Sequence, residues 1–281
     1  MKKIYLLIFA AMTFSPAANA WNSAIHTGIA AIADANLTPA TRKAVAEALD
    51  GHTISNYAYW MDDVAGIDKY AASRQWHNVA LTPKGKIIVA KKAAKSQSED
   101  IRSAQAFDGL VKAIEALKKR DTLSKEEIAD NIRFIVYILA DLHCPSHYVY
   151  SDLLAERSWK YFRDKAKKGD SYMAFWDGIS ITGTFNWRAN EFAHQLNRKS
   201  AGEIEALTDG SITKWIESNA AEYRKIYSMI TPDKRFDGKE FRLWLNGIYP
   251  FSTEQVAVAG YRIAKVLNGL FDDGEPAAAI K

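Results

Sequence analysis

The sequence has little cysteine, little net charge and no long apolar run beyond its first twenty residues. Its single cysteine, Cys144, excludes an internal disulfide framework. No later run approaches the roughly 18 apolar residues that a membrane-spanning helix needs, so we expect no stable membrane insertion. The 37 lysines and arginines nearly balance the 33 aspartates and glutamates, which excludes a highly charged disordered chain. The composition is typical of a globular protein.

The first twenty residues have the pattern of a secretory signal peptide. Two lysines precede an apolar run over residues 4–14, and a small-x-small cleavage signature follows at residues 18–20. We therefore expect export, to the periplasm or the medium, with Trp21 as the mature amino terminus. Cleavage removes two lysines and no acidic residue, which lowers the formal charge from +4 to +2. So small a charge excludes strong nonspecific binding along a nucleic-acid backbone.

Helix signals dominate the remainder of the chain. Ser124 and Glu127 match a capping box at the start of a long apolar helix, which Pro145 ends. Ser252 and Gln255 repeat the capping-box pattern and predict a helix over residues 252–269. The other predicted helices cover residues 24–36, 38–50, 100–119, 171–181, 186–197 and 214–227. These signals predict an all-α fold.

Strand and linker signals are few. A small β-hairpin is predicted from residues 79–81 and 86–89 around a Pro-Lys-Gly turn. We find no flexible linker and no internal repeat, so the interpretation is one multi-helix domain over residues 21–271. Residues 272–281 are predicted to be a flexible tail, and we expect a monomer.

Polar residues gather at the end of the long apolar helix. Arg133, Tyr137 and Asp141 recur every fourth position and project from one side. His147 follows a proline and can turn back toward the same space, whereas His143 points to roughly the opposite side. A buried carboxylate needs a cation, a metal or hydrogen-bond donors. An Arg133–Asp141 pair within the helix and a metal site both satisfy this need.

Ordered clusters of tryptophan, histidine and aspartate carry a family resemblance. They are Trp21 with His26, Trp60-Met61-Asp62, Trp76-His77, Asp141-x-His-x-Pro-x-His147 and Trp176-Asp177. In this order they resemble the zinc-dependent single-strand nucleases of the S1/P1 family, to which the bacterial zinc phospholipases C are related. The resemblance implies a mostly helical domain that holds up to three zinc ions. It also implies a substrate, namely single-stranded DNA or RNA, or nucleotides.

The resemblance implies a set of metal ligands. One zinc ion would take the Trp21 amino group and carbonyl, His26 and Asp141. A second would take Asp62, His77 and Asp141, and a third would take His147 and Asp177. The family has a further histidine in the second set and in the third, where this chain has Tyr137 and Met173.

The two substitutions change what each set can bind. Tyr137 leaves three protein ligands in the second set, which is enough for zinc, and its hydroxyl is expected to hydrogen-bond Asp141 or a bound water. Met173 is a poor zinc ligand. Cys144 is a candidate auxiliary ligand three residues before His147, although a free cysteine is commonly a buried small hydrophobe. We therefore expect two zinc ions rather than three.

The catalytic residues implied by the resemblance are Asp62 and Asp141. Zinc ions at these carboxylates would lower the pKa of a water molecule toward about 7 and clamp the phosphodiester. From helical phase alone, Arg133 is a candidate cation that faces the phosphate.

Three functions remain open at this point. The first is a zinc-dependent nuclease. The second is a non-catalytic or weakly active homologue that acts as a binding protein, which the substitutions Tyr137 and Met173 favour. The third is a phospholipase C-like phosphodiesterase, in which Glu typically stands at the position of Asp177. The aspartate here favours nucleotides.

Overall fold

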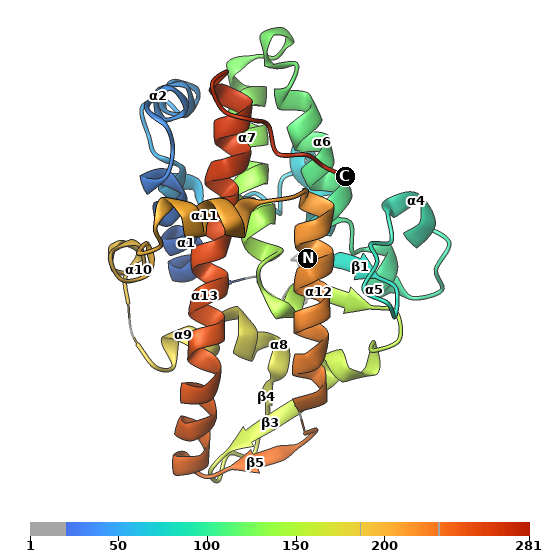
Figure 1. Ribbon diagram of the computed structural model, residues 1–281. Coiled ribbons are helices and arrows are strands. Elements are labelled where there is room, and N and C mark those ends of the chain that lie inside the picture. Colours follow the sequence, from blue (N-terminus) through green and yellow to red (C-terminus); the bar gives the residue numbers. More distant parts are fainter. Residues whose placement is uncertain (1–20, 186, 230) are drawn as a thin grey trace, which may run out of the picture.

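The computed structural model describes the chain from Trp21 to Lys281 apart from positions 186 and 230, so the expected signal peptide lies outside the described residues. The helices are α1 Ser23–Ala35, α2 Pro39–Ala48, α3 Trp60–Asp63, α4 Ala90–Ala93, α5 Glu99–Arg102, α6 Ala106–Leu117, α7 Lys125–Asp141, α8 Tyr172–Ala174, α9 Ser180–Thr182, α10 Ala189–Leu196, α11 Ala201–Thr208, α12 Ile212–Met229 and α13 Gly238–Phe271. The strands are β1 Val79–Leu81, β2 Tyr148–Tyr150, β3 Lys160–Arg163, β4 Asp170–Ser171 and β5 Lys234–Phe236. Helices far outweigh strands (Figure 1), so the predicted all-α fold is confirmed.

Helix α7 carries the predicted polar cluster into the core. Its capping box forms as expected, with the Ser124 side chain accepting from the Glu127 backbone and the Glu127 side chain accepting in return. The helix packs against α1, α2, α6 and α13. Its last turns are therefore enclosed, and the Asp141 side chain at its end is 0% exposed.

Helix α13 begins earlier than the capping box at Ser252 predicted. Asp237 is the actual N-cap, and Glu240 completes the capping box there. Pro250 lies inside this helix of 34 residues. A proline inside a helix removes its own N–H from the ladder and crowds the carbonyl four residues earlier, and packing of α13 against α1, α2 and α7 offsets that cost. The start predicted at Ser252 was wrong because the helix is capped at Asp237 and tertiary contacts carry it through Pro250.

The single helix predicted over residues 100–119 is divided into α5 and α6. At the break, Gln105 N–H donates to Gln75 O over 2.8 Å, and Ala106 N–H donates to Asn78 O over 2.8 Å. These bonds replace helical ones and hold the two residues between Gln75 and Asn78, which are Trp76 and His77.

The predicted hairpin differs from the strand pairing in the structure. Residues 86–89 meet the first arm through one antiparallel bridge, Leu81 to Ile87. The main partner of β1 is β2, in parallel register with Val79 opposite Tyr148. His77 lies two residues before β1 and His147 lies one residue before β2, so the pairing brings two histidines together from distant parts of the sequence. A second sheet, in the order β4-β3-β5, lies at the end of the molecule where α13 begins (Figure 1).

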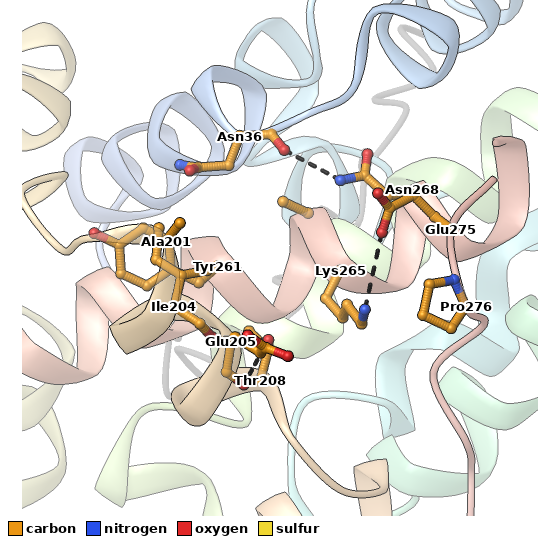
Figure 2. Close-up of a pocket in the computed structure, with 11 residues that line it drawn as sticks. Asn36, Ala201, Ile204, Glu205, Thr208, Tyr261, Lys265, Asn268, Glu275 and Pro276 are labelled. Atoms are coloured by element: carbon orange, nitrogen blue, oxygen red, sulfur yellow. Dashed lines mark hydrogen bonds and ion pairs between the residues drawn. The ribbon is translucent and has the colours of Figure 1, made fainter.

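The tail over residues 272–281 runs back along the start of α12 (Figure 1). Ile212 N–H donates to Ala279 O over 2.8 Å, and Thr213 N–H donates to Ile280 O over 3.0 Å. Its flexibility in solution stays a prediction. A pocket of about 430 Å³ lies between α11, α13 and this tail, and none of the predicted metal ligands lines it (Figure 2).

Among the described residues, no helix has both the length and the hydropathy to cross a membrane.

Candidate metal centre

Asp141 stands between two histidines at the buried end of α7. Its Oδ1 lies 3.2 Å from Nε2 of His26, which α1 supplies, and its Oδ2 lies 3.2 Å from Nδ1 of His77. Neither ring nitrogen of His26 has a hydrogen-bond partner, and Asp141 Oδ1 also lacks one. Buried polar atoms without partners are rare in folded proteins. A divalent cation between His26 Nε2 and Asp141 Oδ1 would give both of these atoms a partner.

Burial disfavours the charged form of the Asp141 carboxylate, and a bound cation would favour that form. Enclosure raises the pKa of Asp141 to about 8, and the neighbouring His26 acts against that rise. Enclosure also lowers the pKa of His77, with Asp62 acting in the opposite direction. Imidazole and carboxylate are the donors that zinc accepts in proteins. The residues present therefore fit a zinc ion, and their role as ligands stays a prediction.

Tyr137 fills the space between these residues, but its partner differs from the one expected. Its hydroxyl donates to Oδ2 of Asp62 and not to Asp141. Its ring stacks on His26, with centroids 4.3 Å apart, and meets the ring of His77 edge-on. The short helix α3 places Asp62 close to α7, since these two helices pack together. Tyr137 therefore links the His26 and Asp62 sides of the group.

Trp21 lies against the last turn of α7. It is 0% exposed, and its indole Nε1 donates to Ala140 O over 3.1 Å. The next residue, Asn22, donates its N–H to Asp177 O over 2.7 Å. A Cβ at Gly178 would lie 2.9 Å from the Asn22 amide nitrogen, so a side chain there would displace that amide. The start of the described chain is thus held between Ala140 and Asp177.

His147 and Asp177 form a second group beside the first. Nε2 of His147 lies 3.9 Å from Oδ1 of Asp177. The Ser146 hydroxyl donates to this oxygen, and Cys144 Sγ lies 3.7 Å from it. Sequence reasoning missed Ser146, although its place between Cys144 and His147 was an available signal. Met173 is buried in α8, one turn before Asp177.

Asp177 occupies a π-helical turn, Phe175–Ile179, of the kind often found at functional sites. Burial raises the pKa of Asp177 to about 7, while Ser146, Cys144 and Arg157 act to lower it. Burial also lowers the pKa of His147. Arg157 Nη1 donates to Ser146 O over 3.0 Å, which brings a cation to this group that the sequence did not predict.

Arg133 does not pair with Asp141. Its guanidinium donates to Asp130 over 3.1 Å and lies over the rings of Tyr57 and Trp60. The interpretation of an Arg133–Asp141 pair was wrong because the arginine reaches back one turn, whereas the aspartate faces two histidines. The phosphate-facing role of Arg133 stays a prediction.

His143 points away from the metal group, as helical phase predicted. Its Nδ1 donates to Leu139 O over 2.7 Å, and its Nε2 accepts from Arg262 of α13 over 2.9 Å. Burial lowers the pKa of His143 to about 3, so it is neutral in this arrangement. It is a core residue with both ring nitrogens hydrogen-bonded.

Comparison with known proteins identifies one family. A family model described as S1/P1 Nuclease matches residues 21–272. The match contains every residue of both donor groups. Among curated proteins, none matches the chain.

Proposed function

Because the chain belongs to the S1/P1 nuclease family, whose members are metal-dependent hydrolases of phosphodiester bonds, we propose that it is an exported, zinc-dependent nuclease. Its substrates are single-stranded DNA or RNA and nucleotides. The observation that carries the proposal is the convergence of His26, His77 and Asp141, in which His26 and Asp141 have buried atoms without hydrogen-bond partners. Asp177, in place of a glutamate, favours nucleotides over phospholipids.

Each residue of the site has a distinct task in this proposal. Asp141 directs one oxygen toward His26 and the other toward His77, so a single carboxylate serves both sides. Bound zinc supplies a Lewis acid that polarises the phosphoryl group and lowers the pKa of water. Tyr137 keeps its proton at neutral pH, because burial raises its pKa well above 10, and its hydroxyl orients the Asp62 carboxylate. Asp62 in turn positions the attacking water.

The test is hydrolysis by protein that starts at Trp21. We expect single-stranded DNA to be cleaved, cleavage to stop with a chelator, and zinc to restore it. Metal binding without hydrolysis of DNA, RNA or nucleotides would instead favour the non-catalytic homologue. Hydrolysis of phosphatidylcholine but not of nucleic acid would favour the phospholipase.

Substitutions of Tyr137 separate its two contacts. Tyr137→Phe removes the hydrogen bond to Asp62, and we expect turnover to fall roughly tenfold with unchanged metal content. Tyr137→His restores the histidine of the family, and we expect zinc to bind roughly tenfold more tightly. Tyr150→Phe is the matched control, since it removes a buried hydroxyl bonded to Ala220 O. Equal losses in the Tyr137→Phe and Tyr150→Phe variants would contradict a specific role for Tyr137.

The amino terminus gives a further prediction. One alanine added before Trp21 displaces the α-amine by about 3.8 Å, while the indole remains held by Ala140 O. We expect the loss of about one metal equivalent and a roughly 10- to 100-fold drop in turnover. Proteolytic removal of the extra residue should restore both values. An extended protein with full metal content would show that the amine is not a ligand.

A further inference from the structure

The turn after α7 holds three donors of different chemistry. One ligand atom each from Cys144, His147 and Asp177 can be chosen so that all three lie within 4.8 Å of one another, and the three residues are buried. The backbone builds this arrangement, since Cys144 N–H donates to Asp141 O and His147 N–H donates to Cys144 O. The thiol and the imidazole therefore belong to one rigid turn, which Asp177 faces from the π-helical turn.

The distances from Asp177 to the other two donors are close to those around a tetrahedral zinc ion. With Zn–S of about 2.3 Å and Zn–N or Zn–O of about 2.0 Å, a tetrahedral angle separates sulfur from oxygen by about 3.5 Å and nitrogen from oxygen by about 3.3 Å. Here Cys144 Sγ lies 3.7 Å and His147 Nε2 lies 3.9 Å from Asp177 Oδ1. These two distances exceed the ideal values by only a few tenths of an ångström, and no pair among the three donors is separated by more than 4.8 Å.

The His147 side chain is evidence for a bound ligand that does not depend on the cysteine. Its side chain is 2% exposed, and neither ring nitrogen has a hydrogen-bond partner. An enclosed imidazole without partners is costly unless something bonds to it. Ser146 does not meet this need, because its hydroxyl is directed to Asp177 and lies 2.9 Å from Cys144 Sγ.

We propose that Cys144, His147 and Asp177 bind a zinc ion through sulfur, nitrogen and oxygen, with the thiolate taking the place of the imidazole that Met173 does not supply. This inference deepens the proposed function and rests on it for the neighbouring zinc site. Binding releases the thiol proton to solvent, because a thiol that coordinates a metal is deprotonated. The site should select zinc, cobalt or cadmium over magnesium and calcium, which prefer oxygen ligands.

Cobalt substitution tests the proposal without an activity assay. Cys144 is the only cysteine in the chain, so any thiolate-to-cobalt charge-transfer band must come from it. Metal-free protein that starts at Trp21 is titrated with Co²⁺ and followed in the near ultraviolet. We expect the band in the unaltered protein, its loss in Cys144→Ser together with one metal equivalent, and its retention in Met173→Leu.

X-ray absorption of the zinc-loaded, unaltered protein makes the test independent of how the variants fold. We expect a sulfur neighbour at about 2.3 Å from a fraction of the zinc. Bound zinc with no sulfur neighbour, or cobalt binding with no charge-transfer band, would overturn the proposal. Sulfur ligation without nuclease activity would count against the proposed function alone, and nuclease activity without sulfur ligation against this site alone.

Discussion

Replacing Asp141 with asparagine is expected to lower phosphodiester hydrolysis roughly 10³-fold and to release bound metal. Metal ions contribute on the order of 4 kcal/mol to such transition states, and each 1.36 kcal/mol is a tenfold change in rate. Asparagine matches aspartate in shape but carries no charge. Its side chain can still contact His77, but it has no negative charge to neutralise bound cations. Metal content by elemental analysis and initial rates on single-stranded DNA measure both effects.

The matched control is Asp130→Asn on the same helix. Asp130 is also buried, but it pairs with Lys69 and Arg133 and accepts from the Tyr70 hydroxyl. We expect this variant to lose about 1–3 kcal/mol of folding stability while it keeps its metal and its turnover. If Asp141→Asn retained full metal content, or if both variants lost activity equally, the assignment of Asp141 would be wrong.

Removing the metal is expected to abolish activity and to make stability depend steeply on pH. In the metal-free protein, burial raises the pKa of Asp141 to about 8 and that of Asp177 to about 7. Between pH 6.5 and 8 the unfolded chain has both carboxylates ionised, whereas the folded chain retains protons on them. The folded state binds more protons, so stability falls as pH rises through this window.

Buried histidines oppose part of this trend. Burial lowers the pKa values of His77, His143 and His147, so they are neutral in the folded state, whereas in the unfolded chain they are about half protonated at pH 6.5. Together they return about 1 kcal/mol of stability as the pH rises to 8. The two carboxylates together then remove about 2–3 kcal/mol between pH 6.5 and 8. After the opposing contribution of the histidines, the net loss is about 1–2 kcal/mol, which corresponds to a fall in the midpoint of thermal unfolding of roughly 2–5 °C.

Zinc should remove the pH dependence, because bound metal keeps the carboxylates ionised in the folded state. Metal at about 100 times its dissociation constant also adds about 2.7 kcal/mol of stability. Thermal unfolding at pH 6.5, 7.2 and 8, with zinc and with chelator, measures both effects. A metal-free protein whose unfolding midpoint is the same at all three pH values would contradict the prediction.

Local sequence signals predicted the elements that depend on neighbouring residues. The capping box at Ser124 starts α7 as expected, because both of its hydrogen bonds join residues three positions apart. Helical phase correctly directs His143 away from Asp141, because residues two positions apart point to roughly opposite sides of a helix. The capping-box pattern at Ser252 was less reliable, since α13 begins at Gly238 and continues through Pro250, where contacts with distant helices outweigh a missing N–H.

The sequence by itself determined the helical class, the ordered residue types that identify the family, and the two substituted histidine positions. Only the tertiary structure decided that Tyr137 bonds Asp62, that Arg133 turns to Asp130, and that β1 pairs with β2. It also placed the Cys144 thiol beside Asp177. Side-chain partners such as Tyr137 and Asp62 lie 75 positions apart in the chain. Their choice depends on distances that packing sets, and no local periodicity records those distances.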